Sequence, residues 1–164
     1  MPGGFEEFVV ARGGELTRFA FVLCGDHHLA EDLVQEVLAH LHDRWPRIER
    51  EVDRPDAYVR TAVVRQFLSW RRRRSSTEAA VAHVPEPPVI GEDGAARHAQ
   101  RDELWRVLTT LPRSQRAVLV LRYYEDLSDA QIAEVLGCAE TTVRGYALRG
   151  LIRLRELFPV EVGP

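Results

Sequence analysis

The stretch DLSDAQIAEVLGCAETTVRGYALRGLIRLRE, residues 126–156, decides the fold of the C-terminal part of the chain. Ser128 and Gln131 form an S-x-x-Q capping box, which predicts the start of a short helix. Gly137 can adopt the left-handed conformation that ends this helix in a tight turn. A longer helix is predicted over residues 140–157, with an inner face made of Val143, Ala147, Leu151 and Leu154. A short helix, a turn and a longer helix predict a helix-turn-helix.

The outer side of the longer helix suits contact with DNA. Its polar and basic side chains can reach base edges and phosphates in a major groove; they are Glu140, Thr141, Thr142, Arg144, Tyr146 and Arg149. The alternative is an ordinary helical hairpin with a solvated arginine face. Three positions favour DNA binding over that alternative: the small Ala133 at the helix crossing, Gly137 in the turn and Val143 in the core.

Further helices are predicted on the N-terminal side of this motif. An apolar helix around residues 114–124 precedes it, and a helix containing Leu104 and Leu111 ends at Pro112. Residues 75–97 contain three prolines and two glycines without a sustained apolar period, so they predict a flexible linker. We therefore expect an all-α protein of two small helical domains, residues 1–74 and 98–158, with a short tail at 159–164.

The sequence of the N-terminal domain predicts three helices. The first begins near Phe5 and ends at Gly25. The second runs to Trp45 and is stopped by Pro46. Asp53, Arg54 and Pro55 are typical of a helix cap with proline in the first turn, and they open the third helix, which ends in a run of four arginines.

Two surfaces of this domain could bind a partner. The second helix carries a polar stripe that includes Asp32, Gln35 and Glu36, and the residues alone assign it no partner. The third helix interleaves aromatic and basic residues, which suits single-stranded or melting DNA: Tyr58, Arg60, Arg65, Gln66, Trp70, Arg71, Arg72, Arg73 and Arg74. The alternatives are that the arginines only complement the helix C-terminus and that Trp70 belongs to the core.

Charge and composition narrow the function classes. The net charge is −3, and residues 75–97 account for all of it, because they hold one arginine and four acidic residues. We therefore expect only weak binding to duplex DNA unless a larger partner holds the chain there. Neither a secretory signal nor a membrane span is apparent, and Cys24 and Cys138 fit no disulfide framework, so a cytoplasmic location is expected.

Two other functions are alternatives for this sequence. A metalloenzyme would have to use Cys24, Asp26, His27, His28 and Glu31, but adjacent histidines diverge and nothing completes a site. We therefore expect no catalytic residues, no metal and no cofactor. A stand-alone helix-turn-helix regulator is the stronger rival, and it predicts specific duplex binding by the free protein.

The combination of segments resembles a known family. AEDLVQEVLAHLHDRW (residues 30–45), DRPDAYVRTAVVRQFLSWRRRR (residues 53–74), a proline-rich linker and LPRSQRAVLVLRYYEDLSDAQIAEVLG (residues 111–137) occur in this order. This is similar to the extracytoplasmic-function (ECF) sigma factors of the sigma-70 family. The resemblance covers residues 5–74 and 98–157. It implies a non-enzymatic protein that binds core RNA polymerase and directs promoter-specific transcription initiation.

The resemblance also implies roles for particular residues. The polymerase face, directed at the β′ clamp helices, would include Asp32, Gln35, Glu36, Arg44 and Trp45. The reader of the promoter −10 element would be a loop at residues 48–54 together with the helix from Tyr58 to Arg74, which carries the nine aromatic, basic and amide residues named above. The −35 reader would use Thr141, Thr142, Arg144, Tyr146 and Arg149. The β flap of polymerase and an anti-sigma protein are further implied partners.

Two positions depart from the family pattern. Arg65 stands where relatives commonly have Asn, so the usual −10 contact is not carried over there. A serine and a second arginine usually follow the position of Arg144, where this chain has Gly145 and Tyr146. Glycine weakens a helix interior by ~1 kcal/mol relative to alanine. Both departures affect the promoter sequence that is expected to be read.

Overall fold

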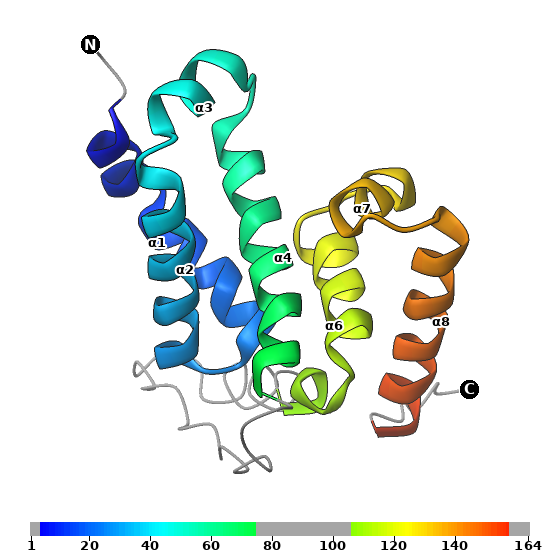
Figure 1. Cartoon of the computed structure of the whole chain (residues 1–164). Helices are drawn as coiled ribbons and strands as arrows, with labels where there is room; N and C mark the ends of the chain where they lie inside the picture. The colour runs from blue at the N-terminus through cyan, green and yellow to red at the C-terminus, as the bar shows by residue number, and fades with distance from the viewer. Residues whose placement is uncertain (1–3, 75–105, 158–164) are drawn as a thin grey trace, which may run out of the picture. The chain divides into compact units, whose positions relative to one another are not determined.

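The computed structural model describes residues 4–74 and 106–157 and divides the chain into two compact units, Met1–Ala82 and His83–Pro164. The described residues form helices and turns and include no β-strand (Figure 1). The predicted all-α class with two helical domains is therefore confirmed. The predicted linker, residues 75–97, and the tail lie outside the described residues.

The first unit packs three long helices around one core. They are α1 (Phe5–Cys24), α2 (His27–His42) and α4 (Pro55–Arg74), and each packs against the other two, while the short α3 (Trp45–Glu51) joins α2 to α4 (Figure 1). Apolar residues at helical spacing form the buried interior, including Leu16, Phe19, Leu23, Leu33, Val59, Val63 and Phe67.

The turn between α1 and α2 is built from a left-handed glycine and an aspartate cap. Gly25 has φ 73° and donates its N–H to the carbonyl of Phe21, as predicted for the end of α1. The carboxylate of Asp26 accepts a hydrogen bond from the N–H of Leu29 at 3.0 Å, which caps α2. His27 stacks on Phe21 with 4.1 Å between ring centroids. Two members of the candidate metal cluster thus have structural roles in this turn.

The prediction that Pro46 ends the second helix is wrong. Helix α2 ends at His42, and Pro46 lies in the first turn of α3. Proline is well suited to a first helical turn, because its missing N–H would have no partner there and its φ is already helical. Helix α3 also reduces the predicted loop at residues 48–54 to residues 52–54.

The second unit contains the predicted helix-turn-helix. A helical segment at residues 106–110 precedes α6 (Arg113–Leu119), which is followed by α7 (Asp129–Leu136) and α8 (Glu140–Leu157). Helix α8 packs against both α6 and α7, and the buried interior includes Leu111, Val118, Leu119, Ile132, Val143 and Ala147. Val143 and Ala147 therefore occupy the predicted inner face of α8, whereas Leu151 and Leu154 are half-buried.

Helix α6 does not continue as an α-helix to Tyr124, as the sequence predicted. Residues Val120–Tyr124 form a π-helical turn, in which the N–H of Glu125 bonds to the carbonyl of Val120 at 3.1 Å. The N–H of Leu127 then bonds to the carbonyl of Leu121 at 3.0 Å. A π-helical turn is wider than an α-helical one, so the chain leaves α6 in a new direction before α7 begins.

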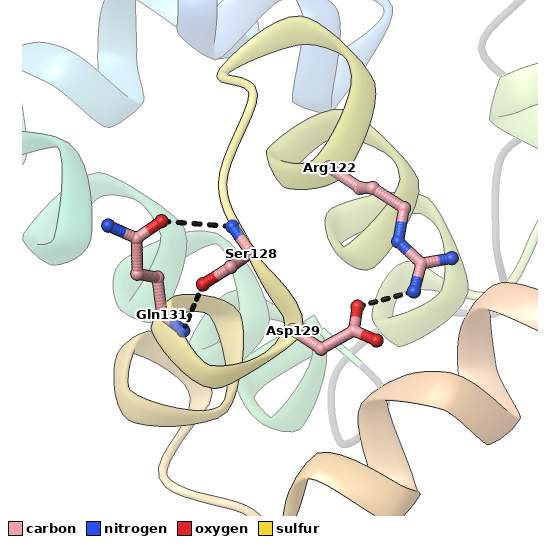
Figure 2. A network of polar contacts seen from close by, with 4 residues as sticks. All are labelled: Arg122, Ser128, Asp129 and Gln131. Carbon is pink, nitrogen blue, oxygen red and sulfur yellow. Dashed lines mark hydrogen bonds and ion pairs between the residues drawn. The ribbon is translucent and has the colours of Figure 1, made fainter.

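The start of α7 is held by reciprocal side-chain contacts (Figure 2). The hydroxyl of Ser128 accepts from the N–H of Gln131 at 3.2 Å, and the side-chain oxygen of Gln131 accepts from the N–H of Ser128 at 2.9 Å. Arg122 forms an ion pair with Asp129 in the first turn of α7. This hydrogen bond to Asp129 raises the pKa of Arg122 above its usual value. The predicted capping box is confirmed, and the ion pair ties it to the preceding π-helical turn.

We expect Ser128→Ala to lower the free energy of unfolding by about 1 kcal/mol, because the N–H of Gln131 loses its acceptor. Urea denaturation followed by far-ultraviolet circular dichroism measures the change. Ser128→Thr retains the hydroxyl and serves as the matched control, with a smaller loss expected. Equal stability of the alanine variant and the native protein would show that the capping box does not stabilise the unit.

Candidate protein and nucleic-acid interfaces

Helix α2 presents a polar face to solvent. Asp32 and Gln35 are exposed, as predicted, while Leu33 and Val37 on the opposite side are buried. Arg44 is also exposed, in the turn that follows α2. These side chains are therefore available to a protein partner that approaches α2 from outside the three-helix core.

Glu36 is instead the centre of a bridge between α2 and α4. One of its carboxylate oxygens accepts from the side-chain amide of Gln66 at 2.9 Å, and the other accepts from the indole N–H of Trp70 at 2.9 Å. Glu36 was predicted to face the polymerase, and the other two to face DNA. The structure thus joins residues that the sequence assigned to two different surfaces. Hydrogen bonds to a charged acceptor are stronger than neutral ones, so the bridge fixes α2 relative to α4.

The expectation that Trp45 lies on the partner-binding face needs correction. Its side chain is 3% exposed and packs against two rings of α1, with centroid distances of 4.5 Å to Phe8 and 5.6 Å to Phe5. An aromatic ring buries a large apolar area, so Trp45 is more stable inside this cluster than on the surface. It anchors the start of α3 on α1.

The residues predicted on α4 divide into exposed and structural groups. Tyr58 is 40% exposed and Arg65 is exposed, and their spacing of seven residues places them on one side of the helix. Arg60 lies 3.6 Å from Glu15 of α1 in a part-buried ion pair, so it connects two helices of the core. Arg71 to Arg74 form the last turn of α4, and their side chains lie outside the described structure.

The outer face of α8 contains both predicted and unpredicted residues. Thr141, Arg144 and Arg149 are exposed, and Thr142 and Tyr146 are half-buried. The guanidinium carbon of Arg149 lies 5.3 Å from the centroid of the Tyr146 ring, within the range of a cation–π contact. This face therefore offers separate arginines to a nucleic acid, with Arg149 partly held by its own helix.

Sequence reasoning missed the exposed apolar residues of α8, which are Leu148, Ile152 and, at the end of the helix, Leu157. Leu148 is 61% exposed and Ile152 is 47% exposed, although both belong to an otherwise amphipathic helix. Their exposure could have been predicted from the helical spacing. Val143, Ala147 and Gly150 lie on the buried side of α8, and the same spacing places positions 148 and 152 on the opposite side.

Neither a metal site nor a membrane span is found in the part of the chain that the structure describes. No three or more His, Cys, Asp or Glu side chains of these residues come together as metal ligands would. None of the helices in this part is both long and apolar enough to cross a membrane.

Comparison with protein families gives two matches along the chain. Sigma-70 region 2 matches residues 8–77, and Sigma-70, region 4 matches residues 101–154. The first match contains α2 and α4, and the second contains the whole of α7 and most of α8. The polar bridge and the helix-turn-helix described above thus fall in separate family regions.

Curated relatives match nearly the whole chain. The RNA polymerase sigma-E factor of Streptomyces coelicolor is 38% identical over 152 residues, which cover 93% of this chain and 84% of that protein. The ECF RNA polymerase sigma factor SigL of Mycobacterium tuberculosis is 34% identical and covers 87% and 84%.

A solved structure shows the same fold. It is the sigma factor RpoE in complex with the anti-sigma factor NepR from Bartonella quintana, with a TM-score of 0.72, 23% identity, and coverage of 96% of this chain and 98% of that one. The order of the two matched regions and the identity to curated relatives agree with the helix-turn-helix and the exposed face of α2. The chain therefore belongs to the extracytoplasmic-function sigma factors of the sigma-70 family, the proteins that bind core RNA polymerase and direct promoter-specific transcription initiation.

Proposed function

We propose that this sigma factor binds core polymerase through the exposed face of α2 and reads the promoter through α4 and α8. The observation that carries the proposal is the presence, in one chain, of a solvent-facing polar stripe on α2 and a helix-turn-helix with exposed arginines on α8. Residues 1–74 would act as region 2, 75–97 as the linker, 98–158 as region 4 and 159–164 as a tail. The experiment that tests the whole proposal is transcription in vitro with sigma-free core polymerase.

In this proposal the chain acts by binding and catalyses no reaction, and it works in the cytoplasm with bacterial polymerase. The β′ clamp helices are the proposed partner of region 2, and the β flap is that of region 4. An anti-sigma protein is a proposed third partner, since a solved relative of the same fold is bound to one. The stand-alone regulator is disfavoured, because the family matches account for both units of the chain.

The residues predicted for region 2 divide into contact and positioning groups. Asp32, Gln35 and Arg44 are exposed and are the proposed polymerase contacts. Tyr58 and Arg65, with the four arginines that end α4, are the proposed −10 contacts. Glu36, Gln66 and Trp70 act through the bridge that holds α2 against α4. Arg60 acts through its ion pair with α1.

For the polymerase face, we expect the double change Asp32→Ala and Gln35→Ala to weaken core binding about tenfold. This corresponds to the loss of two interfacial hydrogen bonds of roughly 0.5–1.5 kcal/mol each. A titration of labelled sigma factor with core polymerase measures the affinity, and the melting temperature should change little because both side chains are exposed. The matched control removes two exposed side chains from α1, with Glu6→Ala and Arg18→Ala. Undiminished binding by the α2 variant would contradict the assignment.

For Trp70, we expect Trp70→Phe and Trp70→Ala alike to reduce promoter opening. Phenylalanine retains a ring that can stack on a base but lacks the N–H that bonds to Glu36. Permanganate reactivity of promoter thymines measures opening, and urea denaturation should show a loss of about 1–2 kcal/mol for Trp70→Phe. Normal opening with phenylalanine and reduced opening with alanine would assign Trp70 to base stacking instead.

For the −35 element, we expect Arg144→Ala to relax base preference at one position at a cost of about 1–3 kcal/mol. Arg149→Ala should instead weaken all promoters alike and reduce the dependence of binding on salt, since it removes a phosphate contact. The two residues lie about 140° apart around α8, so they cannot point at the same base. Transcription from a panel of −35 variants by each holoenzyme measures both effects. Uniformly lower output with an unchanged preference for Arg144→Ala would mean that the two roles are reversed.

A further inference from the structure

Helix α8 contains two glycines, and the packing of the protein explains one of them. A Cβ added at Gly150 would lie 2.9 Å from Cδ1 and 3.4 Å from Cγ of Leu119, whose side chain is buried in the contact between α6 and α8. Gly150 is itself buried. A glycine at position 150 therefore lets the two helices approach closely.

Gly145 has no such explanation within the described structure. A Cβ added there would meet only the guanidinium of Arg149, at 3.7 Å from Nη2 and 4.0 Å from Cζ, which is ordinary van der Waals contact. Its φ is not among the positive values, which occur only at Gly25 and Gly137 among the described glycines. Glycine nevertheless destabilises a helix interior relative to alanine. The folded unit would therefore accommodate alanine at this position and be more stable with it.

The position of Gly145 on α8 suggests what the missing side chain permits. At about 100° per residue, Thr141 and Arg149 lie about 40° from Gly145 around the helix, and Leu148 lies about 60° from it. These three neighbours are exposed, and the buried residues Val143 and Ala147 lie on the other side. Gly145, which is half-buried beside the guanidinium of Arg149, thus leaves the middle of this face without a side chain of its own.

We propose that Gly145 is the point of closest approach between α8 and duplex DNA, and that Gly145 and Leu148 together accept the methyl group of a thymine in the −35 element. The proposal rests on the proposed role of α8 as the −35 reader. A helix with its side chains is about 10–12 Å across and the major groove is about 12 Å wide, so one side chain fewer at the centre lets the helix lie deeper.

The chemistry of the neighbours identifies the group that is recognised. The thymine C5-methyl is the one apolar group on the base edges of the major groove. Leu148 is 61% exposed and lies about 60° from Gly145 around the helix, so its apolar side chain borders the space left by the missing side chain on one side. We call this space the notch. The exposed Arg144 lies about 40° from Leu148 around the helix and suits a guanine edge. The notch therefore adds a preference for thymine beside the base that Arg144 reads.

The test uses holoenzyme reconstituted from core polymerase and full-length sigma factor. Active −35 sequences are first selected from a promoter library in which this element is randomised. Each thymine of the selected element is then replaced by deoxyuridine, which removes only the methyl group. For native holoenzyme we expect one replacement to lower promoter binding about fourfold, the equivalent of burying one methyl group.

Variants of the protein distinguish a specific effect of the notch from effects of protein stability or of lost apolar surface. Leu148→Ala should reduce the deoxyuridine effect to less than about twofold, whereas Ile152→Ala removes another exposed apolar side chain of α8 and should leave it unchanged. Gly145→Ala should raise the melting temperature while lowering output from the selected promoters. Gly14→Ala is the matched control for stability, because a Cβ at this glycine of α1 would meet nothing within 4 Å. It should raise the melting temperature without changing the selected sequences.

The outcomes distinguish the two levels of the proposal. If native holoenzyme selects no −35 sequence, the proposed role of α8 fails. If it selects a sequence but deoxyuridine has no effect at any thymine, or the element contains no thymine, the notch is wrong. The same conclusion follows if Gly145→Ala gives unchanged output and unchanged selected sequences.

Discussion

One part-buried carboxylate joins the proposed polymerase and promoter surfaces of the first unit. Glu36 lies on α2 one residue after the exposed Gln35, and it accepts hydrogen bonds from Gln66 and Trp70 on α4. A carboxylate in this position is costly to desolvate, and its hydrogen bonds offset that cost only while both helices keep their places. The bridge therefore makes the separation between α2 and α4 nearly fixed. A partner that holds α2 also orients α4, so the proposed polymerase binding and the proposed −10 reading would be mechanically linked within this unit.

The second unit achieves the same rigidity by different means. Its helix-turn-helix is held at the start of α7 by the Ser128 capping box and by the ion pair between Arg122 and Asp129, and at the end by the left-handed Gly137. Gly150 then allows α8 to pack closely on α6. These constraints fix where the outer face of α8 points, because α8 is held on both α6 and α7. Recognition by such a face depends on which side chains stand at its centre rather than on any movement of the helix.

The sequence predicted features that depend on neighbouring residues and failed where distant residues decide. The capping box and the turns at Gly25 and Gly137 arise from hydrogen bonds within a few positions, so their residue types reveal them. Pro46 is compatible with either the end or the start of a helix, and the burial of Trp45 against α1 selects the start. The partners of Glu36 lie 30 and 34 residues away, and helical spacing on α2 contains no sign of them. Exposed positions such as Asp32, Gln35, Arg144 and Arg149 were predictable, because amphipathic spacing alone places them.

The near-neutral charge of the chain is consistent with DNA contacts that select particular bases and contribute little general affinity for DNA. Affinity of a free protein for duplex DNA depends mainly on phosphate neutralisation, and a net charge of −3 gives little of it. A free sigma factor with this charge would not accumulate on the many non-specific sites of a genome. Once core polymerase holds the chain near DNA, binding of the second surface becomes intramolecular, so even a weak contact is occupied. In its proposed −35 role, α8 would then need to discriminate between bases rather than to supply affinity. The proposed notch of Gly145 and Leu148 would meet that requirement, because recognition of a single methyl group changes promoter choice without adding general attraction to DNA.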